Sequence, residues 1–120
     1  MSFSGKKTGS VGEDLAEAHL LKKGYTILRR NYVTKVGEVD IIAQKQETVV
    51  FVEVKAFADN SWEGVSPAVN VTPGKQKKII RVARQYIATL PREPYCRFDM
   101  VAVRTAPEIV IEHFEGAFTE

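Results

Sequence analysis

Residues 37–55 read GEVDIIAQKQETVVFVEVK. Two apolar runs, residues 37–43 and 48–54, flank the polar residues 45–48, which suit a four-residue hairpin loop. Both faces of this hairpin are largely apolar, as is typical of a sheet covered on both sides. The stretch therefore predicts a buried β-hairpin.

Charged side chains gather at the open end of this hairpin. If the loop is centred between residues 46 and 47, Asp40 faces Glu53 and Glu38 faces Lys55 on one side of the sheet. The other side then holds Val39, Ile41, Ala43, Val50, Val52 and Val54. Opposed carboxylates with Cβ atoms ~5 Å apart repel each other, and a hard divalent cation with oxygen ligands offsets that repulsion. The alternatives are an exposed hairpin end with a Glu38–Lys55 surface ion pair, or a one-residue bulge that changes the register.

A helix is expected from about Val11 to Lys23, after a flexible basic tail at residues 1–10. Its stripe of Glu13, Ala16, Glu17 and Leu20 would face the sheet, and Glu13 in the first turn would then reach the charged hairpin end. The alternative is that Glu13 only complements the helix dipole.

The remaining elements follow from turn and cap signals. Residues 25–32 are rich in β-formers, residues 56–71 are expected to be mostly loop, and Thr72-Pro73 begins a helix that runs to about Leu90. Residues 98–103 and 109–114 are the last two strands. The order α-β-β-β-α-β-β predicts one layered α/β domain over residues 11–120.

The second helix carries two polar features. Gln76 lies within its apolar arc and needs a polar partner, for which the charged hairpin end is a candidate. Its opposite side is basic. A basic helix face can follow a phosphate backbone, although a solvated surface is the alternative. Trp62, in the loop before this helix, either stacks on an unpaired base or anchors the loop. The nucleic-acid-binding candidates are Lys77, Lys78, Arg81, Arg84 and Trp62.

Composition sets the broad class of protein. The chain has 120 residues, is 44% hydrophobic and 27% charged, and carries a net charge of +2. No apolar run is long enough to span a bilayer, and no secretory signal is recognisable. Cys96 is the only cysteine, so an internal disulfide is excluded. We therefore expect a cytoplasmic protein with no membrane partner.

The chain resembles the YraN family of predicted bacterial endonucleases, within the PD-(D/E)xK nuclease superfamily and distantly similar to archaeal Holliday-junction resolvases. The resemblance rests on six segments in order, over about residues 9–104: Gly12-Glu13, Gly24-Tyr25, Arg30-Asn31-Tyr32, Gly37-Glu38-Val39-Asp40, Phe51-Val52-Glu53-Val54-Lys55 and Arg97-Phe98-Asp99. A second-helix start at Lys75-Gln76 also matches. Packing or ion pairing is the expected role of Arg30-Asn31 and of residues 97–99.

The resemblance implies a restriction-endonuclease-like three-layer domain, with a central mixed sheet flanked by helices. It implies that Asp40 and Glu53 bind Mg²⁺ or Mn²⁺, that the Val54 carbonyl adds a ligand, and that Glu13 assists directly or through water. Lys55 would orient the attacking water and stabilise charge on the phosphate. Glu38, Lys75 and Gln76 are accessory candidates. Phe57 stands where related sequences usually have a basic residue.

The sequence thus predicts a metal-dependent endonuclease acting on branched or single-stranded DNA in repair or recombination, with RNA as an open alternative substrate. The rival hypothesis is a catalytically silent module that kept the nuclease fold and binds nucleic acid or a protein partner. We also expect a homodimer, because two sites in fixed relation are needed to cut a duplex or junction symmetrically. The edge strand at residues 109–111 is the candidate contact.

Overall fold

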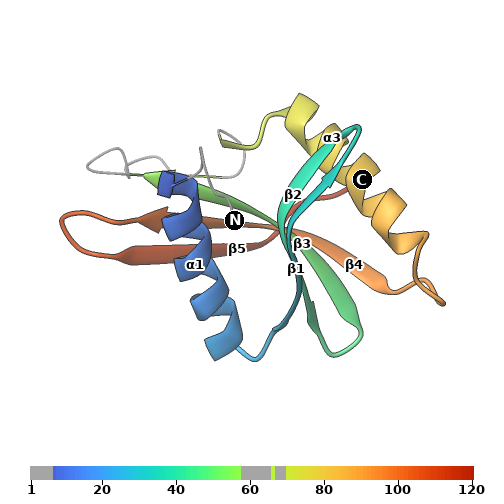
Figure 1. The fold of residues 1–120 in the computed structure, drawn as a ribbon, viewed down its shortest axis with the longest axis horizontal. Helices are drawn as coiled ribbons and strands as arrows, with labels where there is room; N and C mark the ends of the chain where they lie inside the picture. The colour runs from blue at the N-terminus through green and yellow to red at the C-terminus, as the bar shows by residue number, and fades with distance from the viewer. Residues whose placement is uncertain (1–6, 58–65, 67–69) are drawn as a thin grey trace.

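The computed structural model describes residues 7–57, 66 and 70–120 (Figure 1). Its elements are α1 (Lys7–Lys22), β1 (Thr26–Thr34), β2 (Gly37–Lys45), β3 (Thr48–Phe57), α3 (Pro73–Ile87), β4 (Tyr95–Arg104) and β5 (Val110–Phe118). The five strands form one sheet in the order β1-β2-β3-β4-β5. β3 and β4 are parallel, whereas the other neighbouring pairs are antiparallel. The predicted fold class and element order are confirmed.

The sheet has a separate apolar core on each face, because the strands in its centre are apolar on both sides. Figure 1 shows α1 and α3 on opposite sides of the sheet. The core under α1 contains Ala16, Leu20, Tyr25, Ile41, Ala43, Val50, Val52, Val101 and Val103. The core under α3 includes Val39, Ile42, Phe51, Ile79, Val82, Tyr86, Phe98 and Met100. The molecule is therefore a three-layer helix–sheet–helix sandwich.

The start of α1 differs from the prediction. The helix begins at Lys7, four residues before Val11, so residues 7–10 of the expected tail are helical. Residues 1–6 lie outside the described residues. Close packing of α1 on β3 depends on Gly12, since a Cβ at that position would lie 3.1 Å from the Ala56 Cβ. This packing carries the next residue, Glu13, to the end of β3.

α3 begins as its cap signal predicts. The Thr72 side chain accepts a hydrogen bond from the Lys75 backbone N–H at 3.2 Å, and Pro73 fills the first helical position. Four buried residues, Ile79, Val82, Ala83 and Tyr86, attach the helix to the sheet. Its first turn therefore lies in a fixed position against the strands.

The β2–β3 hairpin has the predicted register, with Ile42 opposite Phe51 and Lys45 opposite Thr48. The loop is shorter than predicted, because Lys45 and Thr48 pair and only Gln46 and Glu47 turn the chain. Pairing runs only as far as Ile41↔Val52, so the predicted pairs Asp40–Glu53 and Glu38–Lys55 lie beyond the ladder.

The predicted division of β2 into two faces fails at Val39. This residue packs with Ile42 in the core under α3, whereas Ile41 packs under α1. The alternation breaks at Asp40, next to the position on β1 where Asn31 has a φ of 51°. The left-handed conformation of Asn31 changes the direction of β1 at this point. Arg30 pairs with Ile41 before Asn31, and Tyr32 pairs with Val39 after it.

Candidate active site

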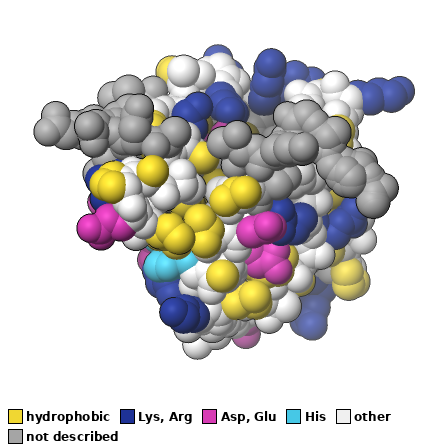
Figure 2. Space-filling model, turned by 60° about the vertical axis from the view of Figure 1, so that its left-hand side comes forward, with side chains coloured by type: hydrophobic (Ala, Val, Ile, Leu, Met, Phe, Trp, Pro, Cys, Tyr) yellow, Lys and Arg dark blue, Asp and Glu magenta, His cyan; other side chains and the backbone are white. Residues whose placement is uncertain are grey.

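A polar cleft opens where β2 and β3 stop pairing, with a volume of about 290 Å³. It is lined by Glu13, Glu38, Asp40, Glu53, Val54, Lys55, Ala56 and Lys75. All the residues predicted to act in catalysis or bind metal therefore line one cleft, together with two of the accessory candidates. Figure 2 shows a face on which acidic side chains lie directly beside basic ones, bordered by hydrophobic side chains.

Asp40 is held against β3 by a hydrogen bond to the backbone. Its Oδ2 accepts the N–H of Val54 at 2.8 Å. The Asp40 carboxylate therefore reaches the opposite strand just beyond the last paired residues, Ile41 and Val52. This contact places it beside the backbone of the residue that follows Glu53.

Glu53 is buried, with 5% of the residue exposed, and its Oε2 lies 2.6 Å from the Nζ of Lys75. Burial raises the pKa of Glu53 to about 7, and the negative charge of Asp40 acts in the same direction. The ammonium groups of Lys75 and Lys55 oppose this rise in pKa but do not cancel it. The site thus has too little positive charge to keep Glu53 fully ionised.

Glu13 reaches the cleft from α1, and β1 holds its carboxylate in place. Asn31 Nδ2 donates to Glu13 Oε1 at 2.8 Å, and Arg30 Nη2 lies 3.4 Å from the same oxygen. Arg30 also pairs with Asp14 and Glu17 through Nη1. Two successive residues of β1 can reach Glu13 because the left-handed Asn31 interrupts the strand alternation.

The expected ion-pairing role of Arg30 is confirmed. Its contact with Glu13 was not predicted from the sequence. The sequence feature that could have indicated this contact is the helical stripe of Glu13 and Glu17, because two acids facing the sheet need a cation on the facing strand. The positive φ of Asn31 had no comparable signal, although asparagine is one of the residues that tolerate it.

The donor set of the cleft fits a hard divalent cation. Asp40, Glu53 and the Val54 carbonyl offer only oxygen, which Mg²⁺ and Mn²⁺ prefer. In the part of the chain that the structure describes, no group of three His, Cys, Asp or Glu side chains is arranged to hold a metal ion. Mg²⁺ commonly binds through one or two carboxylates and completes its shell with water and substrate oxygens, so two acids suffice.

Among the described residues, Gln76 and the basic candidates on α3 do not line the cleft. Gln76 Nε2 donates to the backbone carbonyl of Val71, just before α3, at 2.9 Å, so its polar partner is this carbonyl and not the charged hairpin end that the sequence suggested. Trp62 lies outside the described residues. The basic candidates on α3 are exposed, namely Lys77, Lys78, Arg81 and Arg84, and the last of these pairs with Glu120 at 3.0 Å.

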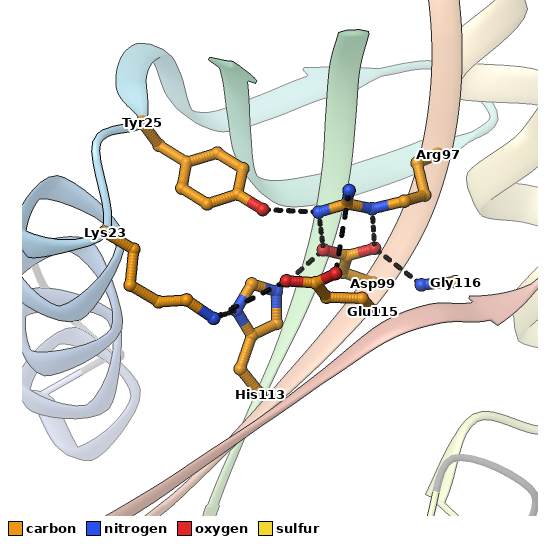
Figure 3. A network of polar contacts seen from close by, with 7 residues as sticks. All are labelled: Lys23, Tyr25, Arg97, Asp99, His113, Glu115 and Gly116. Carbon is orange, nitrogen blue, oxygen red and sulfur yellow. Dashed lines mark hydrogen bonds and ion pairs between the residues drawn. The ribbon is translucent and has the colours of Figure 1, made fainter.

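A polar network centred on the buried Asp99 joins β4, β5 and the chain that follows α1 (Figure 3). Asp99 is fully buried; it accepts hydrogen bonds from Arg97 at 2.8 and 2.9 Å and from the Gly116 N–H at 2.9 Å. His113 Nε2 lies 2.7 Å from Asp99, and His113 Nδ1 lies 2.9 Å from Lys23 Nζ. An ammonium can only donate, so His113 Nδ1 accepts and its Nε2–H donates to Asp99.

This network explains the Arg97-Phe98-Asp99 motif as a structural feature. Arg97 also contacts the Tyr25 hydroxyl, which ties the chain after α1 to the sheet. Burial alone would raise the pKa of Asp99, but the hydrogen bonds from His113, Arg97 and Gly116 outweigh burial and lower it. The expectation of ion pairing at residues 97–99 is therefore confirmed.

A larger cavity, of about 860 Å³, lies between α3 and the ends of β4 and β5. Its lining includes the aromatic rings of Phe98 and Phe118, and the Arg84–Glu120 ion pair also borders it. The polar cleft is the better candidate site, because it gathers the carboxylates and lysines that hydrolytic chemistry needs.

The fold and the cleft together define an α/β protein with a five-stranded mixed sheet, consistent with the restriction-endonuclease-like class. The chain belongs to the family described as "Uncharacterised protein family UPF0102", whose model matches residues 12–103. The matched stretch includes all the described residues that line the cleft.

Similar proteins cover nearly the whole chain. A UPF0102 protein of Chlorobium limicola is 45% identical over 93% of this chain and 92% of its own length. One from Nitrosomonas europaea is 39% identical over 100% of this chain and 99% of its own. One from Saccharophagus degradans is 45% identical over 94% of this chain and 93% of its own length. Among the described residues, neither helix is long and apolar enough to cross a membrane.

Proposed function

We propose that this protein is a divalent-metal-dependent endonuclease that hydrolyses phosphodiester bonds in DNA. The observation that carries the proposal is that Asp40, Glu53 and Lys55 line one cleft, in which burial and the Asp40 charge raise the pKa of Glu53. Such a site lacks positive charge, and a divalent cation supplies it. The sequence resemblance to the PD-(D/E)xK nucleases also supports metal-dependent hydrolysis of phosphodiester bonds.

Asp40 and Glu53 would hold Mg²⁺ or Mn²⁺, with the Val54 carbonyl as a further oxygen ligand. When bound, the metal acidifies a water molecule and offsets charge on the phosphate oxygens. Lys55 provides a cation for the negative charge that develops on the phosphate during attack. Glu13, whose Oε1 is held by Asn31 and Arg30, would accept a hydrogen bond from a water molecule on the metal.

The exposed basic side of α3 would bind the nucleic-acid backbone beside the cleft. Lys75 at the start of the helix lines the cleft, and Lys77, Lys78 and Arg81 continue along the exposed surface. Contacts of this kind fix a strand in place without reading its sequence. This arrangement favours a substrate selected by its structure, such as branched or single-stranded DNA in repair or recombination in the cytoplasm.

A homodimer would place two such clefts in fixed relation. Ile109, with 57% of its surface exposed, precedes β5, which lies at the edge of the sheet. An unpaired, apolar edge strand favours pairing with a second copy. Light scattering at high concentration, with and without DNA, should give the dimer mass, whereas a monomer in both conditions would exclude this assembly.

The proposed activity is tested by cleavage of a panel of duplex, single-stranded and branched DNA with Mg²⁺ or Mn²⁺. Wild-type protein and the Glu53→Ala variant, purified in parallel, should differ by at least about a hundredfold in rate. Equal cleavage by both preparations would assign the activity to a contaminant or another site.

A catalytically silent binding or docking module is the second candidate, favoured by one observation. Lys75 Nζ already contacts Glu53 at 2.6 Å and so partly satisfies its charge. DNA binding that Mn²⁺ does not change, without cleavage of any substrate, would identify this function instead.

A further inference from the structure

Lys75 occupies the position next to Glu53 where a cation is needed. Its Nζ lies 2.6 Å from Glu53 Oε2. The Glu53 side chain is 6% exposed, whereas the Lys75 side chain is 46% exposed. A buried carboxylate is thus paired with a flexible side chain that can leave toward solvent without unfolding its helix.

The location of Lys75 in α3 is unfavourable for a cation unless acids surround it. It lies in the first turn of α3, where the backbone N–H groups give the helix end a partial positive charge, and the described first turn contains no acid. Burial disfavours the charged form of Lys75, but Glu53, Asp40 and Glu38 outweigh burial and raise its pKa. The carboxylates of the cleft therefore hold this ammonium in place.

A divalent cation and this ammonium would compete for one oxygen atom. Glu53 Oε2 contacts Lys75, and Asp40 Oδ2 accepts the Val54 N–H. A cation coordinated by Glu53 at that oxygen brings two positive charges within a few Å of Lys75 Nζ, and like charges at such distances repel strongly in a partly buried site.

We propose that Lys75 is the resident counter-ion of the cleft and that a divalent cation binds Glu53 by displacing the Lys75 ammonium group. This inference rests on the proposed function, because it requires metal binding at Glu53. It makes Lys75 a residue that weakens metal binding, although it lines the site. It also explains how the buried carboxylate is stabilised in the metal-free protein.

The direct test is the Kd for Mn²⁺, measured by calorimetry without nucleic acid, in wild type, Lys75→Met and Lys77→Met. Methionine keeps an unbranched side chain as far as the ε position and removes the charged ammonium group. Lys75→Met should bind Mn²⁺ at least about fivefold more tightly than wild type, because no ammonium has to leave. Lys77→Met loses the same charge from the exposed side of α3 and should change the Kd by less than about twofold.

A second measurement uses the wild-type protein and does not depend on the folding of a variant. Side-chain ¹⁵N and ¹³C NMR should show the Lys75 Nζ and Cε resonances shifting toward those of a solvated lysine as Mg²⁺ is added. The Lys77 resonances should not move with them.

The outcomes separate this inference from the proposed function. Tighter binding in Lys75→Met, including the case in which only that variant binds measurably, supports displacement. Equal or weaker binding in Lys75→Met, or unchanged Lys75 resonances at metal saturation, overturns the inference and leaves the proposed metal site standing. Absence of binding in both proteins without nucleic acid overturns this inference, whereas the proposed function is overturned only if wild type also fails to bind Mn²⁺ with DNA present.

Discussion

The carboxylate of Asp40 accepts a hydrogen bond from the backbone N–H of Val54, across 2.8 Å, at the place where β2 and β3 stop pairing. A side chain thus contacts the opposite strand directly beyond the end of the regular ladder. Because Val54 follows Glu53 and precedes Lys55, this one bond fixes Asp40 relative to both. The geometry of the cleft depends on it.

The stability of the metal-free protein should depend on the protonation of Glu53. Its pKa is raised from 4.5 to about 7, so the folded protein holds this proton more tightly than the unfolded chain. Between about pH 5 and pH 8, the free energy of unfolding of wild type should therefore fall by about 2 kcal/mol more than that of Glu53→Gln. Urea denaturation of both proteins in chelator measures this difference. Parallel pH profiles for wild type and Glu53→Gln would contradict the raised pKa.

Lys55 should act on the phosphate rather than on the metal. Lys55→Met removes the cation that stabilises the developing charge and should lower the rate of DNA cleavage by about 10²- to 10³-fold. The Kd for Mn²⁺ should stay equal to or tighter than that of wild type, because no ligand is lost. A variant that cleaves at the wild-type rate would remove Lys55 from the chemistry.

Asn31 should contribute through its backbone conformation and through its side chain, and two substitutions separate these effects. Asn31→Gly keeps the positive φ and loses only the hydrogen bond to Glu13. Asn31→Ala loses the bond and also strains the backbone, so its free energy of unfolding should be lower by about a further 1 kcal/mol. Urea denaturation measures both; a less stable glycine variant would show that the left-handed conformation is unimportant.

Asp99 should be one of the largest single contributors to stability. It is fully buried and accepts hydrogen bonds from three groups, so Asp99→Asn should lower the free energy of unfolding at pH 7 by about 3 kcal/mol. Its lowered pKa means that this contribution is present above about pH 4 and is lost as the pH falls through the folded-state pKa. The difference in free energy of unfolding between wild type and Asp99→Asn should therefore become smaller at acidic pH. A variant as stable as wild type at pH 7 would exclude this role.

Local patterns were sufficient to predict much of the fold. The two apolar runs around residues 45–48 fixed the β2–β3 register, because a one-residue slip would bury polar side chains. The Thr72-Pro73 signal located the start of α3. The start of α1 was missed because the residues before Val11 are small or basic and carry no apolar stripe, so only the folded chain reveals that the helix extends to Lys7.

The residues of the candidate site could be predicted from the sequence, but the contacts that hold them in place could not. The spacing of Asp40 and Glu53 placed both at one end of the hairpin, and the cleft lining agrees. The Asp40–Val54 bond, the left-handed Asn31 and the Lys75–Glu53 pair each arise from contacts between distant parts of the chain. Periodicity describes one element at a time and carries no information on such contacts.

Calorimetry with Mn²⁺, with and without a short DNA duplex, measures whether the cleft binds a divalent cation through its carboxylates. Asp40→Asn keeps an acceptor for the Val54 N–H but removes the charge, and Asp14→Asn removes an exposed acid outside the cleft as the matched control. We predict binding to wild type that weakens at least about tenfold in Asp40→Asn and changes less than about twofold in Asp14→Asn. Equal binding by wild type and Asp40→Asn, or no binding to wild type with DNA present, would show that these carboxylates do not form a metal site.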